Sequence, residues 1–168
     1  GKKGQKITLL VSESLTDEGA CNQRQTGRQH YYEYTLKGEG VETWHPRFSY
    51  YGFRYIQVEG AVLKGQKNPH RLPVIQKIQS CFVYNSAPKV STFQCSNRIF
   101  NEAHRLIEKA VRSNMQSVFT DCPHREKLGW LEQDHLCGPG LLYNYDLTGF
   151  LPQTLQNIAD AQHANGAV

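Results

Sequence analysis

The sequence predicts an α+β protein in which a run of strands is followed by a run of helices. Apolar side chains show period-2 alternation in the first part of the 168-residue chain, and they recur at helical spacing in the last part. Strands that precede helices in this way are typical of α+β proteins or of separate domains. Each part is small for an independent core, and both ends of the chain look unfinished, so we expect pieces of two domains.

Three segments of the first part predict strands joined by turns. Residues 7–11 and 32–37 show the alternation, and residues 53–58 are aromatic and β-branched, as strands prefer. The Lys-Gly-Glu-Gly sequence at residues 37–40 predicts a turn. Strands at this short spacing favour an antiparallel sandwich. Residues 64–92 are rich in Lys, Gln, Asn, Pro and Ser, and they predict a connector with one or two short strands.

Three segments of the last part predict helices. Ser96 is a favourable N-cap, and apolar side chains follow it at i, i+3 and i+4, which predicts a helix over residues 96–115. Residues 131–145 form a second candidate, weakened by Pro139 between two glycines. Residues 151–162 carry apolar side chains on one face and form the third.

The composition predicts a globular protein with a modest core. Apolar residues make up 39% of the chain, and no apolar run approaches the ~18–20 residues that cross a bilayer, so we expect no membrane insertion. No signal-peptide core follows the basic N-terminus, so the protein is cytosolic or any export signal lies outside this stretch. The five cysteines lack a C-x-x-C pair, which excludes a zinc ribbon and a disulfide scaffold but leaves one bridge with three free thiols open.

The charge distribution is uneven but gives no sign of a nucleic-acid partner. Residues 1–90 carry 13 basic and 7 acidic side chains, whereas residues 91–168 carry 6 and 8. A basic half can bind a polyanion, yet no run of five Lys or Arg occurs. The aromatic residues 50–55 differ in order from an RNA-recognition strand. We therefore expect a solvated basic surface.

Polar chemistry is concentrated in residues 120–135, between the first two predicted helices. Four of the eight acidic residues of the second half lie there, namely Asp121, Glu126, Glu132 and Asp134. Pro123 and Gly129 disfavour helix on either side, so the segment is predicted to be irregular, as functional sites often are.

Carboxylates, Arg125 and Trp130 on one loop suit a sugar site. A carboxylate can accept hydrogen bonds from vicinal hydroxyls, and an indole can pack on the apolar face of a pyranose. A carboxyl with a raised pKa can also protonate a glycosidic oxygen. Spacing alone leaves the alternative open, in which these are solvated charges around a Trp130 that anchors the core.

The same segment favours neither a metal site nor a cysteine nucleophile. The pairs Cys122-x-His124 and His135-x-Cys137 match neither usual zinc spacing. An acid at position 121 disfavours the thiolate of its neighbour Cys122. We expect no metal and no cofactor.

Five segments match, in order along nearly the whole chain, the pattern of one known family. Residues 121–133 (DCPHREKLGWLEQ) are similar to Asp-Cys-Pro-x-Arg-(Asp)-Glu-Arg-x-Gly-Trp-x-Gly-Asp. Residues 42–56 are similar to Glu-x-Trp-x-Pro-x-Phe-(Ser/Thr)-Tyr-x-Gly-Phe-Arg-Tyr, and residues 92–97 to the segment before the family's first helix. Residues 143–146 and 159–162 also fit. The chain thus resembles the bacterial α-L-rhamnosidases of glycoside hydrolase family 78.

The resemblance implies a multidomain arrangement. Residues 1–62 would be the C-terminal part of a β-sandwich domain, residues 63–93 a connector with short strands, and residues 94–168 the first helices of an (α/α)6 barrel. Because such a barrel needs many more helices than three, we expect the remainder of the full-length enzyme as a partner. The bacterial family favours a periplasmic or extracellular location over a cytoplasmic one.

The resemblance also implies inverting hydrolysis of terminal α-L-rhamnosides, with a rhamnose-containing carbohydrate as substrate. Glu126 matches the general acid, and Asp121 matches an aspartate that hydrogen-bonds the rhamnose hydroxyls. Arg125 and Trp130 match members of the same pocket. Gln133 stands where the family has a pocket aspartate, and its amide cannot act as an anion.

Two departures bear on activity. The family often has two consecutive acids after the arginine, whereas Glu126 alone precedes Lys127 here. No counterpart of the family's late general-base glutamate is present, so we expect this chain alone to be inactive. The alternative is a non-catalytic carbohydrate-binding or structural fragment.

Overall fold

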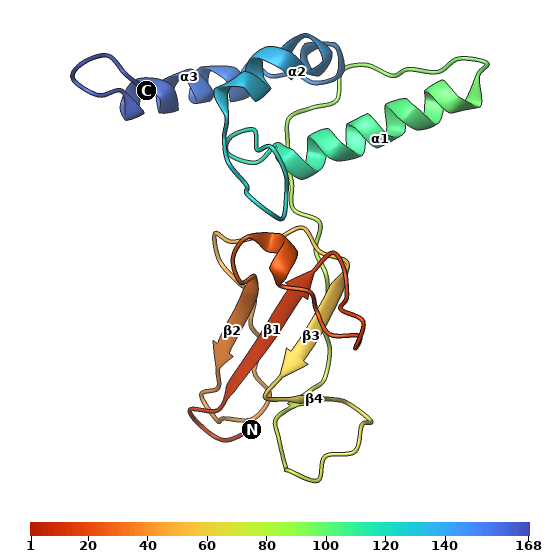
Figure 1. Ribbon diagram of the computed structural model, residues 1–168, viewed down its shortest axis with the longest axis vertical. Coiled ribbons are helices and arrows are strands. Elements are labelled where there is room, and N and C mark those ends of the chain that lie inside the picture. The colour runs from red at the N-terminus through yellow and green to blue at the C-terminus, as the bar shows by residue number, and fades with distance from the viewer. The chain divides into compact units, whose positions relative to one another are not determined.

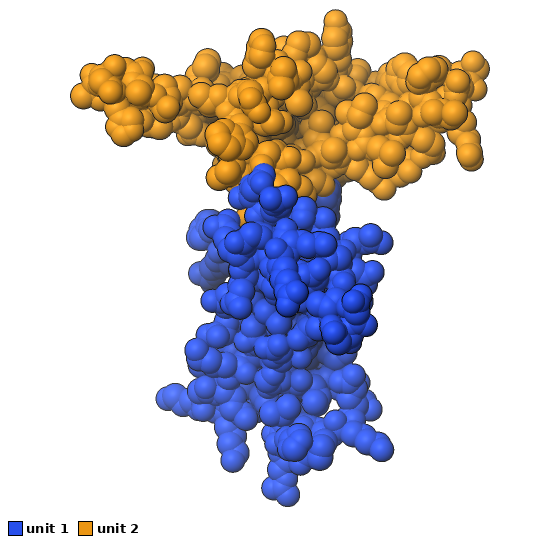
Figure 2. All heavy atoms as spheres, in the orientation of Figure 1, with its two compact units in different colours: residues 1–82, 124–126 blue, residues 83–123, 127–168 orange.

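The computed structural model describes all 168 residues, which form two compact units (Figure 1 and Figure 2). Unit 1 comprises Gly1–Phe82 together with His124–Glu126, and unit 2 comprises Val83–Pro123 and Lys127–Val168. Every named strand lies in unit 1 and all three α-helices lie in unit 2. Strands followed by helices confirm the predicted α+β class.

Unit 1 is built on a three-stranded antiparallel sheet (Figure 1). In spatial order its strands are β2 (Tyr31–Thr35), β1 (Lys6–Ser12) and β3 (Tyr55–Glu59). Leu9 of the central strand lies opposite Tyr32 on one side and Val58 on the other, so apolar and aromatic side chains pair across the sheet. All three strands were predicted, although the third begins at Tyr55 rather than at residue 53.

A short parallel pair adds to unit 1. β4 (Val62–Leu63) pairs with β5 (Val74–Ile75), and β5 lies within the residues predicted to form a connector. Two-residue strands are too short to produce a periodic pattern, so the sequence could indicate their presence but not their place.

The predicted Lys-Gly-Glu-Gly turn is held by Glu42. Its carboxylate accepts hydrogen bonds from the backbone N–H groups of Lys37 and Gly38, each at 2.9 Å, and from the Tyr34 hydroxyl at 2.7 Å. These hydrogen bonds, led by the one from Lys37, lower the pKa of Glu42 to about 2. Gly38 has a φ of 85°, and a Cβ there would collide with the backbone of Lys3, so the turn requires glycine.

The helices of unit 2 lie within two residues of their predicted bounds. They are α1 (Arg98–Asn114), α2 (Leu131–Asn144) and α3 (Phe150–Ala161). The predicted cap of α1 was wrong, because Asn97 and not Ser96 holds that position: its side-chain Oδ1 accepts from Ile99 N at 2.9 Å. α2 continues through Pro139.

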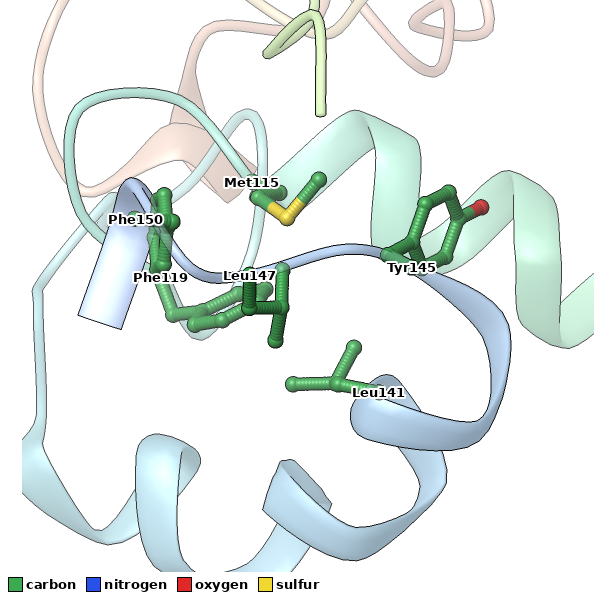
Figure 3. Packing of buried hydrophobic residues seen from close by; sticks show 6 residues of the cluster. All are labelled: Met115, Phe119, Leu141, Tyr145, Leu147 and Phe150. Carbon is green, nitrogen blue, oxygen red and sulfur yellow. The ribbon is translucent and has the colours of Figure 1, made fainter. Parts of the chain in front are cut away.

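The core of unit 2 lies where the ends of its helices meet (Figure 3). Its six buried side chains are Met115, Phe119, Leu141, Tyr145, Leu147 and Phe150. The rings of Phe119 and Phe150 pack edge to face with centroids 4.8 Å apart. α1 contributes no buried residue of its own, and its Ile99, Phe100 and Leu106 are exposed.

Two further expectations concern the whole chain. All five cysteines are free thiols in the structure, so the one bridge that the sequence left open is not formed. None of the helices combines the length and the apolar character that a membrane span needs.

Candidate functional site

The charge-rich loop between α1 and α2 is closed at its base by Asp121. One carboxylate oxygen of Asp121 accepts hydrogen bonds from the backbone N–H groups of Cys122 and Leu128, both at 2.9 Å. The Asp121 N–H donates in turn to the carbonyl oxygen of Leu128 at 3.0 Å. Hydrogen bonds to a carboxylate are stronger than neutral ones, so Asp121 fixes the two ends of an irregular segment.

Two backbone positions on the returning side of the loop restrict its conformation. Lys127 has a φ of 54°, a left-handed conformation that costs a non-glycine residue about 1–3 kcal/mol when the surroundings impose it. At Gly129 an added Cβ would lie 3.2 Å from Cγ2 of Val118, so this glycine permits a close approach of the chain. The path between Asp121 and α2 is therefore specified by backbone geometry as well as by the carboxylate.

The tip of the loop, His124–Glu126, belongs to unit 1. The Nε2 atom of His124 lies 3.2 Å from Oε2 of Glu13, and Nε of Arg125 lies 3.4 Å from Oε1 of Glu126. The Glu126 side chain is 46% exposed. Both Arg125 and Glu126 therefore lie at the surface of the loop tip.

The beginning of α2 lines an open groove in unit 2. The groove has a volume of about 570 Å³, and its polar lining comes from Trp130, Glu132 and Asp134 of the loop and α2 and from Thr154 and Asn157 of α3. Trp130 is the residue before the first turn of α2, and it is 54% exposed. An exposed indole beside carboxylates provides a flat apolar surface next to hydrogen-bond acceptors.

Within the groove, one carboxylate oxygen of Asp134 is buried without a hydrogen-bond partner. Its Oδ1 atom is shielded from solvent and accepts no hydrogen bond. This desolvation raises the pKa of the Asp134 carboxyl above its ordinary value of 3.8. A ligand hydroxyl that donates to Oδ1 would satisfy a buried acceptor, which is energetically favourable.

The structure shows the local surroundings of each residue that the sequence analysis assigned to one pocket. Asp121 closes the loop, Arg125 and Glu126 lie in unit 1, and Trp130 lines the groove of unit 2. Gln133 is half-buried, its backbone N–H donates to the Trp130 carbonyl at 3.0 Å, and it is absent from the groove lining.

Four polar residues of the groove, Glu132, Asp134, Thr154 and Asn157, were not assigned as site residues by the sequence analysis. The spacing did contain a signal for Asp134, since it is one of four clustered acids and directly follows Gln133. Asn157 lies on the polar side of a helix that was predicted from its apolar side alone, so the sequence contained no signal for it.

Comparison with known proteins covers both units. Residues 1–84 match the family described as the bacterial alpha-L-rhamnosidase concanavalin-like domain, and residues 88–168 match the bacterial alpha-L-rhamnosidase 6 hairpin glycosidase domain. An alpha-L-rhamnosidase of Formosa agariphila is 32% identical over 163 residues, and one of Streptomyces avermitilis is 33% identical over 171 residues. These matches cover 94% and 99% of this chain but only 16% of each relative.

Solved structures give the same result. The alpha-L-rhamnosidase from Dictyoglumus thermophilum matches 99% of this chain and 18% of its own, with a TM-score of 0.77 and 31% identity. The Streptomyces avermitilis alpha-L-rhamnosidase complexed with L-rhamnose matches 98% and 15%, with a TM-score of 0.71 and 31% identity. The small sheet and the three helices therefore correspond to segments of these larger enzymes. From both units together, the chain belongs to the bacterial α-L-rhamnosidase family.

Proposed function

We propose that this chain is part of an inverting α-L-rhamnosidase and supplies its general acid and part of its sugar pocket. The observation that carries the proposal is the loop closed by Asp121. It presents Arg125, Glu126 and Trp130 with exposed side chains, in a chain whose relatives are α-L-rhamnosidases. One solved relative is complexed with L-rhamnose. A rhamnose-containing carbohydrate is therefore the substrate class for this chain.

The proposed reaction uses two carboxyl groups, one as general acid and one as general base. The protonated carboxyl of Glu126 donates its proton to the glycosidic oxygen as the bond from that oxygen to C1 of rhamnose breaks. A second carboxylate removes a proton from a water molecule, whose oxygen attacks C1 from the opposite face. The products are the free alcohol and rhamnose of inverted configuration, and the two carboxyl groups stand roughly 6.5–9.5 Å apart to leave room for the water.

Two residues of the loop accompany Glu126 in the proposed reaction. Nε of Arg125 lies 3.4 Å from Oε1 of Glu126, within ion-pair distance of its carboxyl group. Arg125 then holds the acid in position, and Trp130 offers its exposed ring to the apolar face of the sugar.

Hydrogen bonding to the rhamnose hydroxyls falls to Asp121, Gln133 and Asp134 in this proposal. Asp121 uses one carboxylate oxygen for the loop backbone. Gln133 can donate and accept through its amide. Asp134 adds the acceptor that the groove leaves unsatisfied, so the anion missing at position 133 is replaced by its neighbour.

The proposal also assigns the chain its place in a larger enzyme. Unit 1 corresponds to the C-terminal part of a β-sandwich domain, and unit 2 to the first helices of an (α/α)6 barrel. The general base is contributed by a residue outside these 168, in keeping with the 16% of each relative's length that the chain spans. The isolated chain then binds rhamnose without hydrolysing its glycosides.

A second candidate, a carbohydrate-binding fragment without catalysis, is favoured by one observation. Gln133 replaces the aspartate of the family's pocket, and Glu126 is 46% exposed rather than buried. Both candidates bind the sugar in the same pocket. They differ in whether Glu126 donates a proton to the glycosidic oxygen.

Tryptophan fluorescence tests the sugar pocket, because the chain has two tryptophans that can be separated by substitution. Trp44 stacks on Tyr34 in unit 1 with ring centroids 5.3 Å apart. In the Trp44→Phe variant the signal comes from Trp130 alone, and we expect L-rhamnose to change it in a saturable manner. The Trp130→Phe variant should give no response. A response that follows Trp44 instead would refute the assignment of the pocket.

Hydrolysis of an aryl α-L-rhamnoside separates the catalytic from the non-catalytic candidate. At micromolar concentration the 168-residue chain should release no aryl alcohol. The full-length enzyme should hydrolyse the substrate and lose about 10²–10⁴-fold in rate in the Glu126→Gln variant, the range associated with a general acid. Unchanged activity of that variant would favour the non-catalytic candidate. If the isolated chain hydrolyses the substrate and Glu126→Gln abolishes this activity, the proposal that the chain is an incomplete catalyst is wrong.

A further inference from the structure

A second pocket lies in unit 1 at the tip of the charge-rich loop. It is lined by Arg24, Gln25, Gly27, His124 and Arg125 and has a volume of about 460 Å³. We call it the basic pocket, because its lining contains two arginines and a histidine but no acidic residue. The two arginines are far apart in the sequence, so composition gave no indication that they share a surface.

The first side of the basic pocket comes from the 3-10 helix Arg24–Thr26. The backbone N–H of Arg24 donates to Oδ1 of Asn22 at 3.0 Å, whereas no carboxylate forms an ion pair with its guanidinium. The side-chain oxygen of Gln25 accepts from the Ser14 hydroxyl at 2.7 Å, which leaves the amide NH₂ of Gln25 as a donor. This side therefore presents N–H donors and a full positive charge.

The second side of the basic pocket comes from the loop tip. His124 is held by Glu13, whose Oε2 lies 3.2 Å from its Nε2, and this contact fixes the tip beside the 3-10 helix within unit 1. Arg125 contacts Glu126 at 3.4 Å, but both side chains are exposed, and exposed ion pairs are weak. The guanidinium of Arg125 thus retains donors for a ligand.

Two guanidinium groups with an amide donor beside them match the chemistry of an oxyanion. Guanidinium presents parallel N–H donors in a planar fork, which pairs in a bidentate manner with carboxylate and with phosphate-like groups such as sulfate. A neutral sugar offers no charge to such a pocket. A carboxylate or a sulfate ester on a saccharide offers both the charge and the geometry.

The position of Arg125 relates the basic pocket to the proposed reaction. Glu126, which directly follows Arg125 and contacts it, is the proposed proton donor to the leaving oxygen. A general acid lies on the side of the leaving group, so residues that flank it lie near the sugar attached to rhamnose. We propose that the basic pocket binds an anionic substituent, a carboxylate or a sulfate, of that second sugar. Its assignment to the leaving group depends on the proposed function, whereas anion binding does not.

Nuclear magnetic resonance of the 168-residue chain tests anion binding directly. The probes are sodium D-glucuronate, inorganic sulfate and, as an uncharged control, methyl α-D-glucoside. We expect glucuronate or sulfate to shift the side-chain Nε resonances of Arg24 and Arg125 in a saturable manner, and the glucoside to leave them in place. The anion that binds more tightly identifies the carboxylate or the sulfate as the recognised group.

Two arginine variants provide the matched comparison. Arg24→Gln removes one guanidinium of the basic pocket and should weaken anion binding about fivefold, the size of one partly exposed charged contact. Arg28→Gln removes an exposed arginine that follows the same helix but does not line the pocket, and it should leave the affinity unchanged. Equal weakening in both variants, or equal shifts with the uncharged glucoside, would overturn the basic pocket as an anion site.

A disaccharide separates this inference from the proposed function. α-L-rhamnosyl-(1→4)-D-glucuronate should bind more tightly than α-L-rhamnosyl-(1→4)-D-glucose, and Arg24→Gln should abolish the difference. If glucuronate binds but L-rhamnose gives no signal at Trp130, the proposed function fails and the anion site stands. If L-rhamnose binds but neither anion does, the anion site fails and the proposed function stands.

Discussion

Asp121 and Glu42 stabilise irregular backbone by the same chemistry, although they lie in different units. Each carboxylate accepts hydrogen bonds from two backbone N–H groups, in the loop before α2 and in the turn after β2 respectively. Because helices and strands satisfy their own N–H groups, irregular segments depend on such side chains. Patterns of spacing indicated that Asp121 matters and could not show that part of its role is to close the loop.

Glu42 predicts a specific dependence of stability on pH. Its pKa is about 2 in the folded chain against an ordinary 4.5, so its ionised form stabilises the fold fully above about pH 4.5. This stabilisation is lost as pH falls from about 4.5 toward 2. We expect the melting temperature of the native chain to exceed that of Glu42→Gln at neutral pH and to converge with it near pH 2.

The control for Glu42 is Glu39→Gln, which removes an exposed glutamate of the same turn. Thermal unfolding followed by circular dichroism from pH 2 to 7 should give this variant the native profile. A native profile for Glu42→Gln as well would mean that the hydrogen bonds to Glu42 contribute no pH-dependent stability.

At the scale of elements, the periodicity of apolar residues located the main strands and helices, but it did not identify the residues that cap them. The start of α1 depends on a contact between Asn101 and Cys95, in which the Asn101 amide accepts from Cys95 N and donates to Cys95 O. This exchange fixes the entry of the chain, and Asn97 rather than Ser96 becomes the cap. Ser and Asn are about equally good caps, so propensity could not choose between neighbours.

The cap of α1 can be tested by local opening. Asn97→Ala removes the acceptor for Ile99 N, which costs about 1 kcal/mol of helix stability and corresponds to roughly fivefold faster opening. Because α1 buries none of its side chains, the change should be confined to its first turn. Amide hydrogen exchange of residues 99–101 should accelerate in Asn97→Ala and stay near the native rate in Asn97→Ser. Ser96→Ala should have no effect, and acceleration in that variant would restore Ser96 as the cap.

At the scale of the whole molecule, the chain contains two units whose interiors are separate. The loop at 120–135 was predicted as one site, yet its tip belongs to unit 1 and its base to unit 2. Sequence neighbours share a surface only when the backbone between them turns suitably, and Asp121, Lys127 and Gly129 determine that turn. The sequence could therefore indicate candidate residues, whereas it could not show that Trp130 lines a groove of unit 2 and that Arg125 lines the basic pocket of unit 1.

Separate interiors predict that unit 2 can be unfolded on its own. Phe119 is 5% exposed and packs on Phe150, so Phe119→Ala should remove about 3–5 kcal/mol, a large share of what a core of six side chains can supply. Phe100→Ala is the matched control, because this phenylalanine is 60% exposed and its loss should cost less than about 1 kcal/mol. Urea unfolding followed at 222 nm reports the helices, all of which lie in unit 2.

The amide resonances of β1 report unit 1 in the same samples. In Phe119→Ala we expect the helical signal to be lost at lower urea while the resonance of Leu9, paired on both sides in the sheet, keeps its native position. Such non-coincident transitions are the signature of a protein that is not two-state. Simultaneous loss of both signals would show instead that the two units unfold together. Equal destabilisation by Phe119→Ala and Phe100→Ala would show that Phe119 does not belong to a core that stabilises unit 2.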